Sequence, residues 1–196
     1  RSVFDIDLDG IGDRVGLLRT GELRQWLGAV QGANAGVPLN NDVLFSTVAI
    51  AGVGDVNGDT FPDVLIGAPL SARAWVYFGS SLGLDRWQTL QPGAPVPGFG
   101  ESVAPAGDVN GDGYADLVVR VGRRGAAVYL GGPSVTLHRW LVATSGELLV
   151  SRAGDVNGDG FGDVLAVPVG RDEGWLYLGS VEGLADGGEL GDDVGA

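Results

Sequence analysis

The sequence contains no cysteine and no methionine, all twelve of its basic residues are arginine, and its only histidine is His138. Without cysteine the chain can form no disulfide and use no thiol nucleophile, and the absence of thiols suits an extracytoplasmic protein. No serine–histidine–aspartate set finds support, and no glycine-rich loop opens a helix that could hold phosphate. These absences predict a protein that is not an enzyme and has no catalytic residue.

Long apolar runs are missing as well. The longest stretch of interest, Val43 to Gly54, has twelve residues, too few to span a bilayer, so we expect no membrane insertion. No signal peptide is visible and the chain begins at Arg1, which leads us to expect a mature or excised piece of a longer protein. We predict a secreted protein, extracellular or at the cell surface.

The formal net charge of −13 disfavours nucleic acid and anionic membranes as partners. Most of this charge is local: four nine-residue segments, at 5–13, 55–63, 108–116 and 155–163, hold 13 of the 25 acidic residues. The first segment has four of them and each of the others has three. Four bound divalent ions would bring the charge to about −5, so the acidity is mainly the signature of a metal site.

Each segment has Asp at position 1, Asp or Asn at position 3, Asp at position 5 and Asp at position 9. Calcium takes six to eight oxygen ligands, and alternate residues of a tight loop can aim side chains at one centre while the backbone carbonyl of position 7 adds another. We therefore predict about four Ca²⁺ ions. The predicted ligands are Asp5, Asp7, Asp9, Ile11, Asp13, Asp55, Asn57, Asp59, Phe61, Asp63, Asp108, Asn110, Asp112, Tyr114, Asp116, Asp155, Asn157, Asp159, Phe161 and Asp163.

Three other interpretations of these segments fit less well. Asn-Gly pairs in three segments also predict hairpin turns without metal, but turn chemistry does not call for a carboxylate five residues later. An EF-hand needs Glu at position 12, where this chain has Gly16, Ile66, Val119 and Ala166. Paired carboxylates occur in glycoside hydrolases, but an active site needs two different environments, whereas these segments recur almost unchanged.

The segments belong to a longer repeat, because their starts lie 50, 53 and 47 residues apart. A second marker, aromatic-apolar-Gly, recurs in phase at 26–28, 77–79, 129–131 and 177–179. A third, Arg-Trp, occurs at 86–87 and 139–140. In the middle repeats we predict strands over 47–51, 64–67, 74–78, 87–90, 102–104, 117–120, 126–130 and 139–142. Several are apolar on both faces, which indicates sheets covered on both sides. Four-stranded sheets at this period predict an all-β propeller.

The stretch Phe99 to Asp116, with Asp63 to Pro69 in the preceding repeat, resembles the FG-GAP repeat of integrin α-subunit propellers and related bacterial propellers. The resemblance covers nearly the whole chain and implies a ring surface that engages a protein or glycan partner. The sequence departs from the pattern in places. Only the repeat at 55 keeps Gly-Ala-Pro, Thr60 stands where a left-handed glycine is expected, and Leu8 replaces the glycine of Asn-Gly.

The two ends suggest how the ring closes. The chain starts almost at a loop, without most of the strand that should precede it, whereas Glu189 to Ala196 resembles Phe99 to Ala104, a leading strand. We predict a single domain over residues 1–196: a monomeric propeller of four four-stranded blades, with one blade shared between the terminal strands. The competing interpretation is a fragment of a propeller of about seven blades.

The single histidine and most of the tryptophans have structural explanations. The repeat register places His138 opposite Asp85 in a fourth strand, and the tryptophans at 26, 75 and 175 fall on blade-packing positions. Only Trp87 and Trp140 are expected to be exposed aromatics suited to binding. The leading hypothesis is a calcium-stabilised, non-catalytic binding or adhesion module. The alternatives are a structural spacer of a surface protein and a non-catalytic part of a polysaccharide-degrading enzyme.

Overall fold

The structure is a computed structural model that describes residues 2–20, 22–28, 36–39, 49–142, 147–171 and 173–190. Within these residues the chain forms sixteen strands in four antiparallel sheets and one 3-10 turn, η1, Pro69–Ser71. The first sheet comprises β1 Ser2–Phe4, β2 Asp13–Leu17, β3 Leu23–Trp26 and β4 Val37–Pro38. The second comprises β5 Ala49–Gly54, β6 Asp63–Ala68, β7 Arg73–Phe78 and β8 Arg86–Leu90. The third comprises β9 Phe99–Gly107, β10 Asp116–Val121, β11 Gly125–Leu130 and β12 Thr136–Val142. The fourth comprises β13 Leu148–Gly154, β14 Asp163–Pro168, β15 Gly174–Tyr177 and β16 Gly188–Leu190.

Each sheet uses its four strands in chain order, as the fifty-residue repeat predicts. The Asp-rich segment always joins the first strand to the second, and the aromatic-apolar-Gly marker ends the third. The predicted strands of the middle repeats are confirmed within a few residues; of the predicted strand 47–51, residues 47 and 48 lie outside the described residues.

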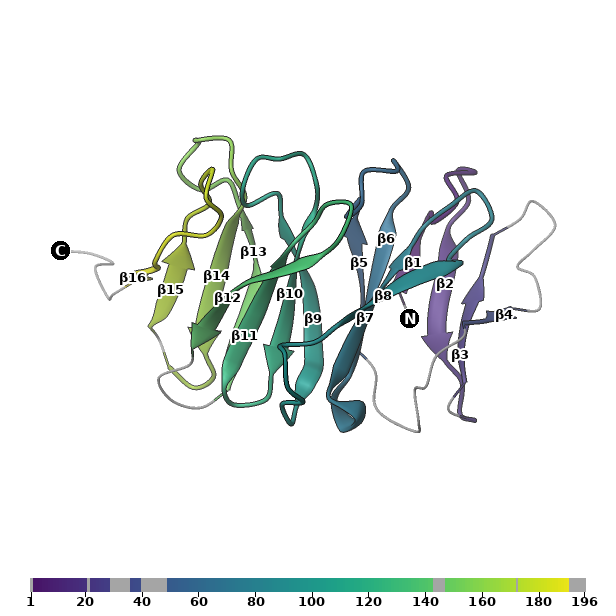
Figure 1. Ribbon diagram of the computed structural model, residues 1–196, viewed down its shortest axis with the longest axis horizontal. Helices are drawn as coiled ribbons and strands as arrows, with labels where there is room; N and C mark the ends of the chain where they lie inside the picture. The colour runs from purple at the N-terminus through teal and green to yellow at the C-terminus, as the bar shows by residue number, and fades with distance from the viewer. Residues whose placement is uncertain are drawn as a thin grey trace.

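Successive sheets stand beside one another in a row, with their Asp-rich loops along the same edge (Figure 1). Three hydrophobic clusters fill the spaces between neighbouring sheets. Strand β6 shows why the sheets need two covered faces: Val64 packs toward the first sheet and Leu65 toward the third, and both are fully buried. This is the propeller-like packing that two-sided apolar strands predict.

A side-chain clamp also joins each pair of neighbouring sheets. Gln25 of β3 donates to Leu84 O over 2.9 Å and accepts from Leu84 N over 2.8 Å. Gln88 of β8 makes the same two bonds with Val135, at 2.7 and 3.0 Å. Arg139 of β12 donates to Leu184 O over 2.6 Å. Side chains of one sheet thus supply hydrogen-bond partners for buried backbone groups of the next sheet.

The shared terminal blade is not found. Strand β1 pairs with β2 within the first sheet, and in β16 Glu189 and Leu190 pair with Trp175 and Gly174 of β15. The terminal strands therefore find partners in their own sheets, and the described residues form an open row with the first and fourth sheets at opposite ends (Figure 1). No closed ring is seen among them. Residues 191–196 of the predicted leading strand lie outside the described residues.

The Arg-Trp marker does not mark equivalent positions. In the second sheet Val76 faces Gln88, and the equivalent Val128 of the third sheet faces Arg139. Tyr129 then faces Leu137, so His138 is the extra residue of a β-bulge. His138 therefore does not take the position of Asp85 as the spacing predicts, because the connection between the paired residues Leu130 and Thr136 is two residues shorter than the one between Phe78 and Arg86, and the bulge adds back only one. The structural counterpart of Arg139 is Gln88, which explains why both clamp the next sheet.

Candidate metal-binding loops

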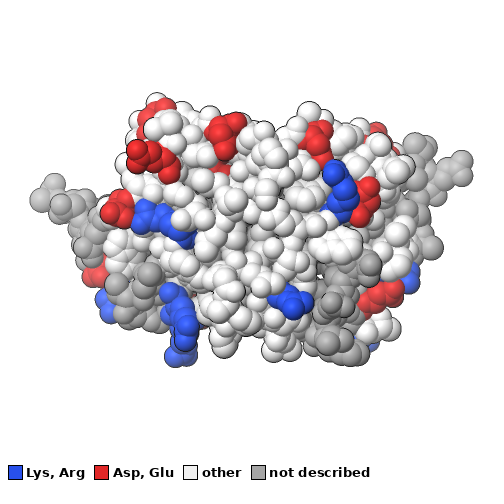
Figure 2. Space-filling view, in the orientation of Figure 1, with Lys and Arg blue, Asp and Glu red and all other residues white. Residues whose placement is uncertain are grey.

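The four Asp-rich loops occupy one edge of the molecule, where acidic atoms gather in Figure 2. In each, the carboxylate of position 1 shapes the turn. Asp55 Oδ1 accepts from Gly58 N over 2.7 Å and from Asp59 N over 3.1 Å, while its Oδ2 accepts from Thr60 N over 2.7 Å. Asp155 makes the same three bonds in the fourth loop. Short-range bonds of this kind explain why the loop forms wherever the pattern occurs.

The carboxylate of position 9 is buried in every loop and ties it to the third strand. Asp116 Oδ2 accepts from Val109 N over 2.7 Å, and its Oδ1 accepts from Gly131 N over 2.8 Å. The same pairs of bonds are made by Asp13 with Ile6 and Gly28, by Asp63 with Val56 and Gly79, and by Asp163 with Val156 and Gly179. This contact explains why the two sequence markers recur in phase.

Burial has an electrostatic consequence for two of these groups. Desolvation raises the pKa of Asp63 and of Asp116 from the ordinary value to about 7, although two backbone N–H donors act on each in the opposite direction. Neighbouring carboxylates of the same loop raise both pKa values further. These carboxyls are costly to ionise unless a positive charge lies nearby.

The glycine of the second marker is required by space. A Cβ on Gly131 would lie 2.5 Å from Ala115 O, and one on Gly79 would lie 2.5 Å from Pro62 O. Both distances are far below van der Waals contact. The backbone therefore reaches the buried carboxylate only because the residue has no side chain.

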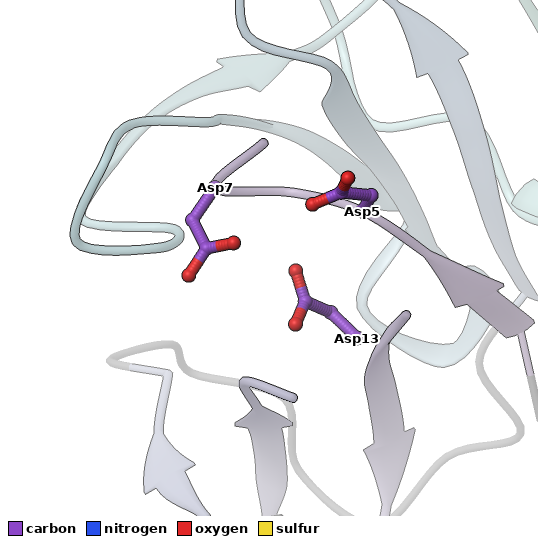
Figure 3. A group of neighbouring side chains, drawn as sticks. All are labelled: Asp5, Asp7 and Asp13. Carbon is purple, nitrogen blue, oxygen red and sulfur yellow. The ribbon is translucent and has the colours of Figure 1, made fainter. Parts of the chain in front are cut away.

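The first loop brings three carboxylates together. Oxygens of Asp5, Asp7 and Asp13 all lie within 4.8 Å of one another, and the three side chains point into a common space (Figure 3). Asp5 Oδ1 is buried and has no hydrogen-bond partner among the described residues. Burial is the main cause that raises the pKa of Asp7, and the neighbouring carboxylates add to it. This all-oxygen donor set, with one buried oxygen left unsatisfied, fits a hard divalent cation.

The other three loops differ at position 3. The amide nitrogen of Asn57 donates to Asp59 Oδ2 over 2.9 Å, and Asn110 and Asn157 bond their loops in the same way at 2.8 Å. These loops offer carboxylates at positions 1, 5 and 9 and an amide oxygen at position 3, again a set of oxygens alone. The carbonyls of Ile11, Phe61, Tyr114 and Phe161 at position 7 stay predicted ligands.

Position 7 has a packing role that sequence reasoning missed. A Cβ on Gly58 would lie 2.6 Å from the Tyr114 ring, and one on Gly111 would lie 2.7 Å from the Phe161 ring. The aromatic ring of the third loop, and that of the fourth, thus rests on the glycine at position 4 of the preceding loop. The sequence signal for this packing is the recurrence of Asn-Gly at positions 3 and 4 together with an aromatic residue at position 7.

Backbone bonds also join the loops to one another. Ala115 N donates to Asp55 O over 2.8 Å, and Gly162 N donates to Asp108 O over 2.6 Å. Both donors occupy position 8. The equivalent residue of the second loop is Pro62, which has no N–H to donate to the first loop.

Two loops contain the strain that the sequence suggests. Thr60 has φ 76° where Gly10, Gly113 and Gly160 have φ 85–92°, and Leu8 has φ 58° where other loops have glycine. Left-handed backbone costs an ordinary residue roughly 1–2 kcal/mol. The loop geometry is therefore kept even where the side chain opposes it.

The tryptophans are arranged largely as predicted. Trp75 is buried, and Trp26 and Trp175 are half-buried. Trp87 is 42% exposed and lies 5.8 Å from the Tyr77 ring, between ring centroids. Trp140 is half-buried against the cluster between the second and third sheets, so it is less open than expected.

Four-stranded sheets that repeat along the chain, each headed by an Asp-rich loop, define a propeller-like repeat protein. The profile described as FG-GAP-like repeat matches residues 55–119 and 108–166, which together make up more than half of the chain. The chain belongs to the FG-GAP-like repeat family, as its resemblance implies.

Integrin α subunits are among the similar proteins. Integrin alpha-7 of Rattus norvegicus is 39% identical over 77 residues, covering 37% of this chain and 7% of the integrin. Integrin alpha-E of Mus musculus is 40% identical over 97 residues, covering 42% and 8%. Integrin alpha-6 of Homo sapiens is 25% identical over 103 residues, covering 52% and 9%. The matched part of this chain thus spans less than a tenth of each relative.

A solved structure described as the crystal structure of BBS1N in complex with ARL6DN, soaked with lead, aligns with 95% of this chain and 79% of that one. The identity is 10% and the TM-score is 0.31, too low for any argument about fold or function. Within the described part of the chain, no helix has the length and apolar character needed to cross a membrane.

Proposed function

We propose that this chain is a calcium-stabilised, non-catalytic adhesion module that works outside the cell or at its surface and engages a protein or glycan partner. The integrin α relatives support the adhesion role. One observation carries the metal: buried Asp5 Oδ1 accepts no hydrogen bond from the described residues, while oxygens of Asp7 and Asp13 approach within 4.8 Å. A buried oxygen without a donor is costly, and a cation removes that cost.

Each loop would hold its ion through the side chains of positions 1, 3, 5 and 9 and the carbonyl of position 7. When bound, calcium supplies two positive charges that offset the repulsion among the carboxylates. The chain's own residues prepare the site: position 1 shapes the turn, and position 9 fastens the loop to the third strand. The metal would therefore stabilise the edge along which the sheets meet.

The size of this stabilisation can be bounded. Extracellular calcium modules have dissociation constants of about 10⁻⁴–10⁻³ M, so millimolar calcium adds up to roughly 1.4 kcal/mol for each site. Four sites approach about 6 kcal/mol, against a usual total of about 5–15 kcal/mol. Calcium would then decide whether the module stays folded.

The test is native mass spectrometry in calcium together with thermal unfolding in calcium and in EDTA. We expect monomers with four ions and a much lower melting temperature in EDTA. Asp5→Ala should remove one ion, whereas Glu182→Ala, which changes an exposed carboxylate outside the loops, should remove none. An unchanged melting temperature in EDTA would refute the calcium role. A dimer with eight ions would mean that two chains complete one ring.

A further inference from the structure

The edge opposite the Asp-rich loops carries arginine in every sheet. Each strand runs from the loop end of its sheet to the opposite end. The turn between the second and third strands therefore lies at the far end from the Asp-rich loop. Each of these turns has exposed arginine: Arg19, Arg73, Arg123 with Arg124, and Arg171. Figure 2 shows acidic atoms gathered along the upper edge and basic atoms at several places along the lower one, with acidic atoms also near its two ends. We call Arg73, Arg123, Arg124 and Arg171 the basic rim.

Acidic side chains near this edge already have partners. Arg120 contacts Glu101 at 3.2 Å and Glu147 at 2.5 Å, and Arg24 contacts Glu22 at 3.1 Å. Within the basic rim, Arg171 lies 3.6 Å from Glu173. Arg73, Arg123 and Arg124 form no ion pair with any described residue. Three of the four rim arginines thus lack a paired carboxylate among the described residues, on a chain whose net charge is −13.

Close backbone contacts join the turns of the second and third sheets. A Cβ on Gly100 would lie 2.5 Å from Arg73 O, and Gly122 N donates to Gly98 O over 3.1 Å. Arg124 N donates to Val121 O over 2.9 Å, which closes the turn that holds both arginines. The rim arginines are therefore presented on a rigid backbone, which lowers the entropy lost on binding.

The turn of the fourth sheet continues this rim. Val169 N donates to Glu147 O over 2.7 Å, and the Glu147 side chain contacts Arg120 of β10. Arg171 N donates to Pro168 O over 3.2 Å. Tertiary contacts therefore align three turns that lie about fifty residues apart in the sequence.

Aliphatic side chains are interspersed among the charges. Leu70 in η1 is 77% exposed, and Val169 in the fourth turn is 51% exposed. Ala72, directly before Arg73, has the left-handed φ of 49°, a conformation that costs free energy and is often kept at binding sites. Arginine is enriched at protein interfaces relative to the rest of the surface.

We propose that the basic rim binds an acidic segment of a protein partner, with carboxylates paired to Arg73, Arg123 and Arg124 and aliphatic side chains packed on Leu70. This inference rests on the proposed adhesion function and names its partner chemistry. The planar guanidinium pairs with a carboxylate through two parallel bonds, which gives orientation as well as attraction. Long polyanions such as DNA fit less well, because their many phosphates would meet the strong negative charge of the rest of the molecule.

The experiment uses fluorescence anisotropy with a labelled peptide of alternating Glu and Leu, in calcium at fixed salt. Arg123→Glu/Arg124→Glu should weaken binding at least about tenfold, because two attractive pairs become repulsive. The matched control is Arg14→Glu/Arg152→Glu, which changes the net charge equally at two exposed arginines outside the rim. It should weaken binding less than about threefold through long-range electrostatics alone. Labelled heparin and duplex DNA serve as competing probes.

Each outcome supports or overturns the proposal. Equal losses in both variants, or no peptide binding to the unaltered chain, would overturn it. Tighter binding of heparin or DNA, lost in the rim variant, would replace the protein partner with a polyanion. The calcium role is read separately from ion counts and melting temperature, so its failure leaves the rim result interpretable. Circular dichroism must show that both variants are folded.

Discussion

The first three sheets and the fourth sheet place matched residues in different surroundings. At position 2 of the loops, Ile6, Val56 and Val109 are fully buried by the following sheet, whereas Val156 is 58% exposed. In the second strands Leu65 is fully buried, and its counterpart Leu165 is only half-buried. The sequence pattern is nearly the same in each repeat. Whether a residue belongs to the core is decided by what lies against its sheet.

The outer face of the first sheet is different in kind. Arg14 is exposed at the position where Val64, Leu117 and Val164 are fully buried against a preceding sheet. The outer face of the first sheet thus carries an exposed arginine, whereas the outer face of the fourth carries exposed Val156 and half-buried Leu165. The following predictions test how far this contrast controls stability.

The largest effect is expected for Val109→Ser. The substitution removes buried methyl groups and places a hydroxyl in an apolar cluster, which should lower the free energy of unfolding by about 3 kcal/mol. The matched Val156→Ser should change it by less than about 0.5 kcal/mol. Urea unfolding followed by tryptophan fluorescence measures both. Equal losses would show that the outer face of the fourth sheet is covered in solution.

Burial of Asp63 and Asp116 also predicts that the free energy of unfolding depends on pH. The pKa values of Asp63 and Asp116 are raised to about 7 in the folded chain, so the folded state holds more protons than the unfolded state between about pH 4 and 7. In EDTA the stability that these two carboxyls contribute should therefore be fully present below about pH 4 and be lost as the pH rises through 7. Urea midpoints at pH 5 and pH 8 measure this fall. Asp116→Asn should flatten the profile and Glu182→Gln should not; a flat profile for the unaltered chain would contradict the burial argument.

The clamps between sheets should contribute less. Gln25 is buried and bonds both backbone groups of Leu84, so Gln25→Ala should cost about 2 kcal/mol by leaving two groups unsatisfied. Gln88→Ala should cost about 1 kcal/mol, because its site is only partly buried. Urea unfolding again gives the values. A larger loss for Gln88→Ala than for Gln25→Ala would contradict the argument from burial.

The smallest effect is a gain. Thr60→Gly should stabilise the chain by up to about 1 kcal/mol, because glycine accepts the left-handed backbone that threonine resists. Asp59, Phe61 and the remaining loop bonds are unchanged by it. Differential scanning calorimetry in calcium detects a shift of this size. A lower melting temperature would mean that the Thr60 side chain makes a favourable contact.

Features that depend on neighbouring residues could be predicted from the amino-acid sequence alone. The four loops, the strands on either side and the fifty-residue repeat follow from short-range bonds such as those of Asp55 and from apolar residues on both strand faces. The same local chemistry makes the oxygen donor set of each loop readable from the spacing of its Asp and Asn residues.

Tertiary packing, in contrast, sets which faces are covered, where the register shifts and which turns meet. A shorter connection before β12 and the bulge at His138 place Arg139 in the position of Gln88 rather than of Arg86, although the sequence shows an Arg-Trp pair in both repeats. The terminal strands pair within their own sheets, β1 with β2 and β16 with β15. Arg73 and Arg123 share one rim because backbone contacts through Gly98 and Gly100 bring the sheets together. Contacts between residues far apart in the chain produce these features, and the local pattern does not encode them.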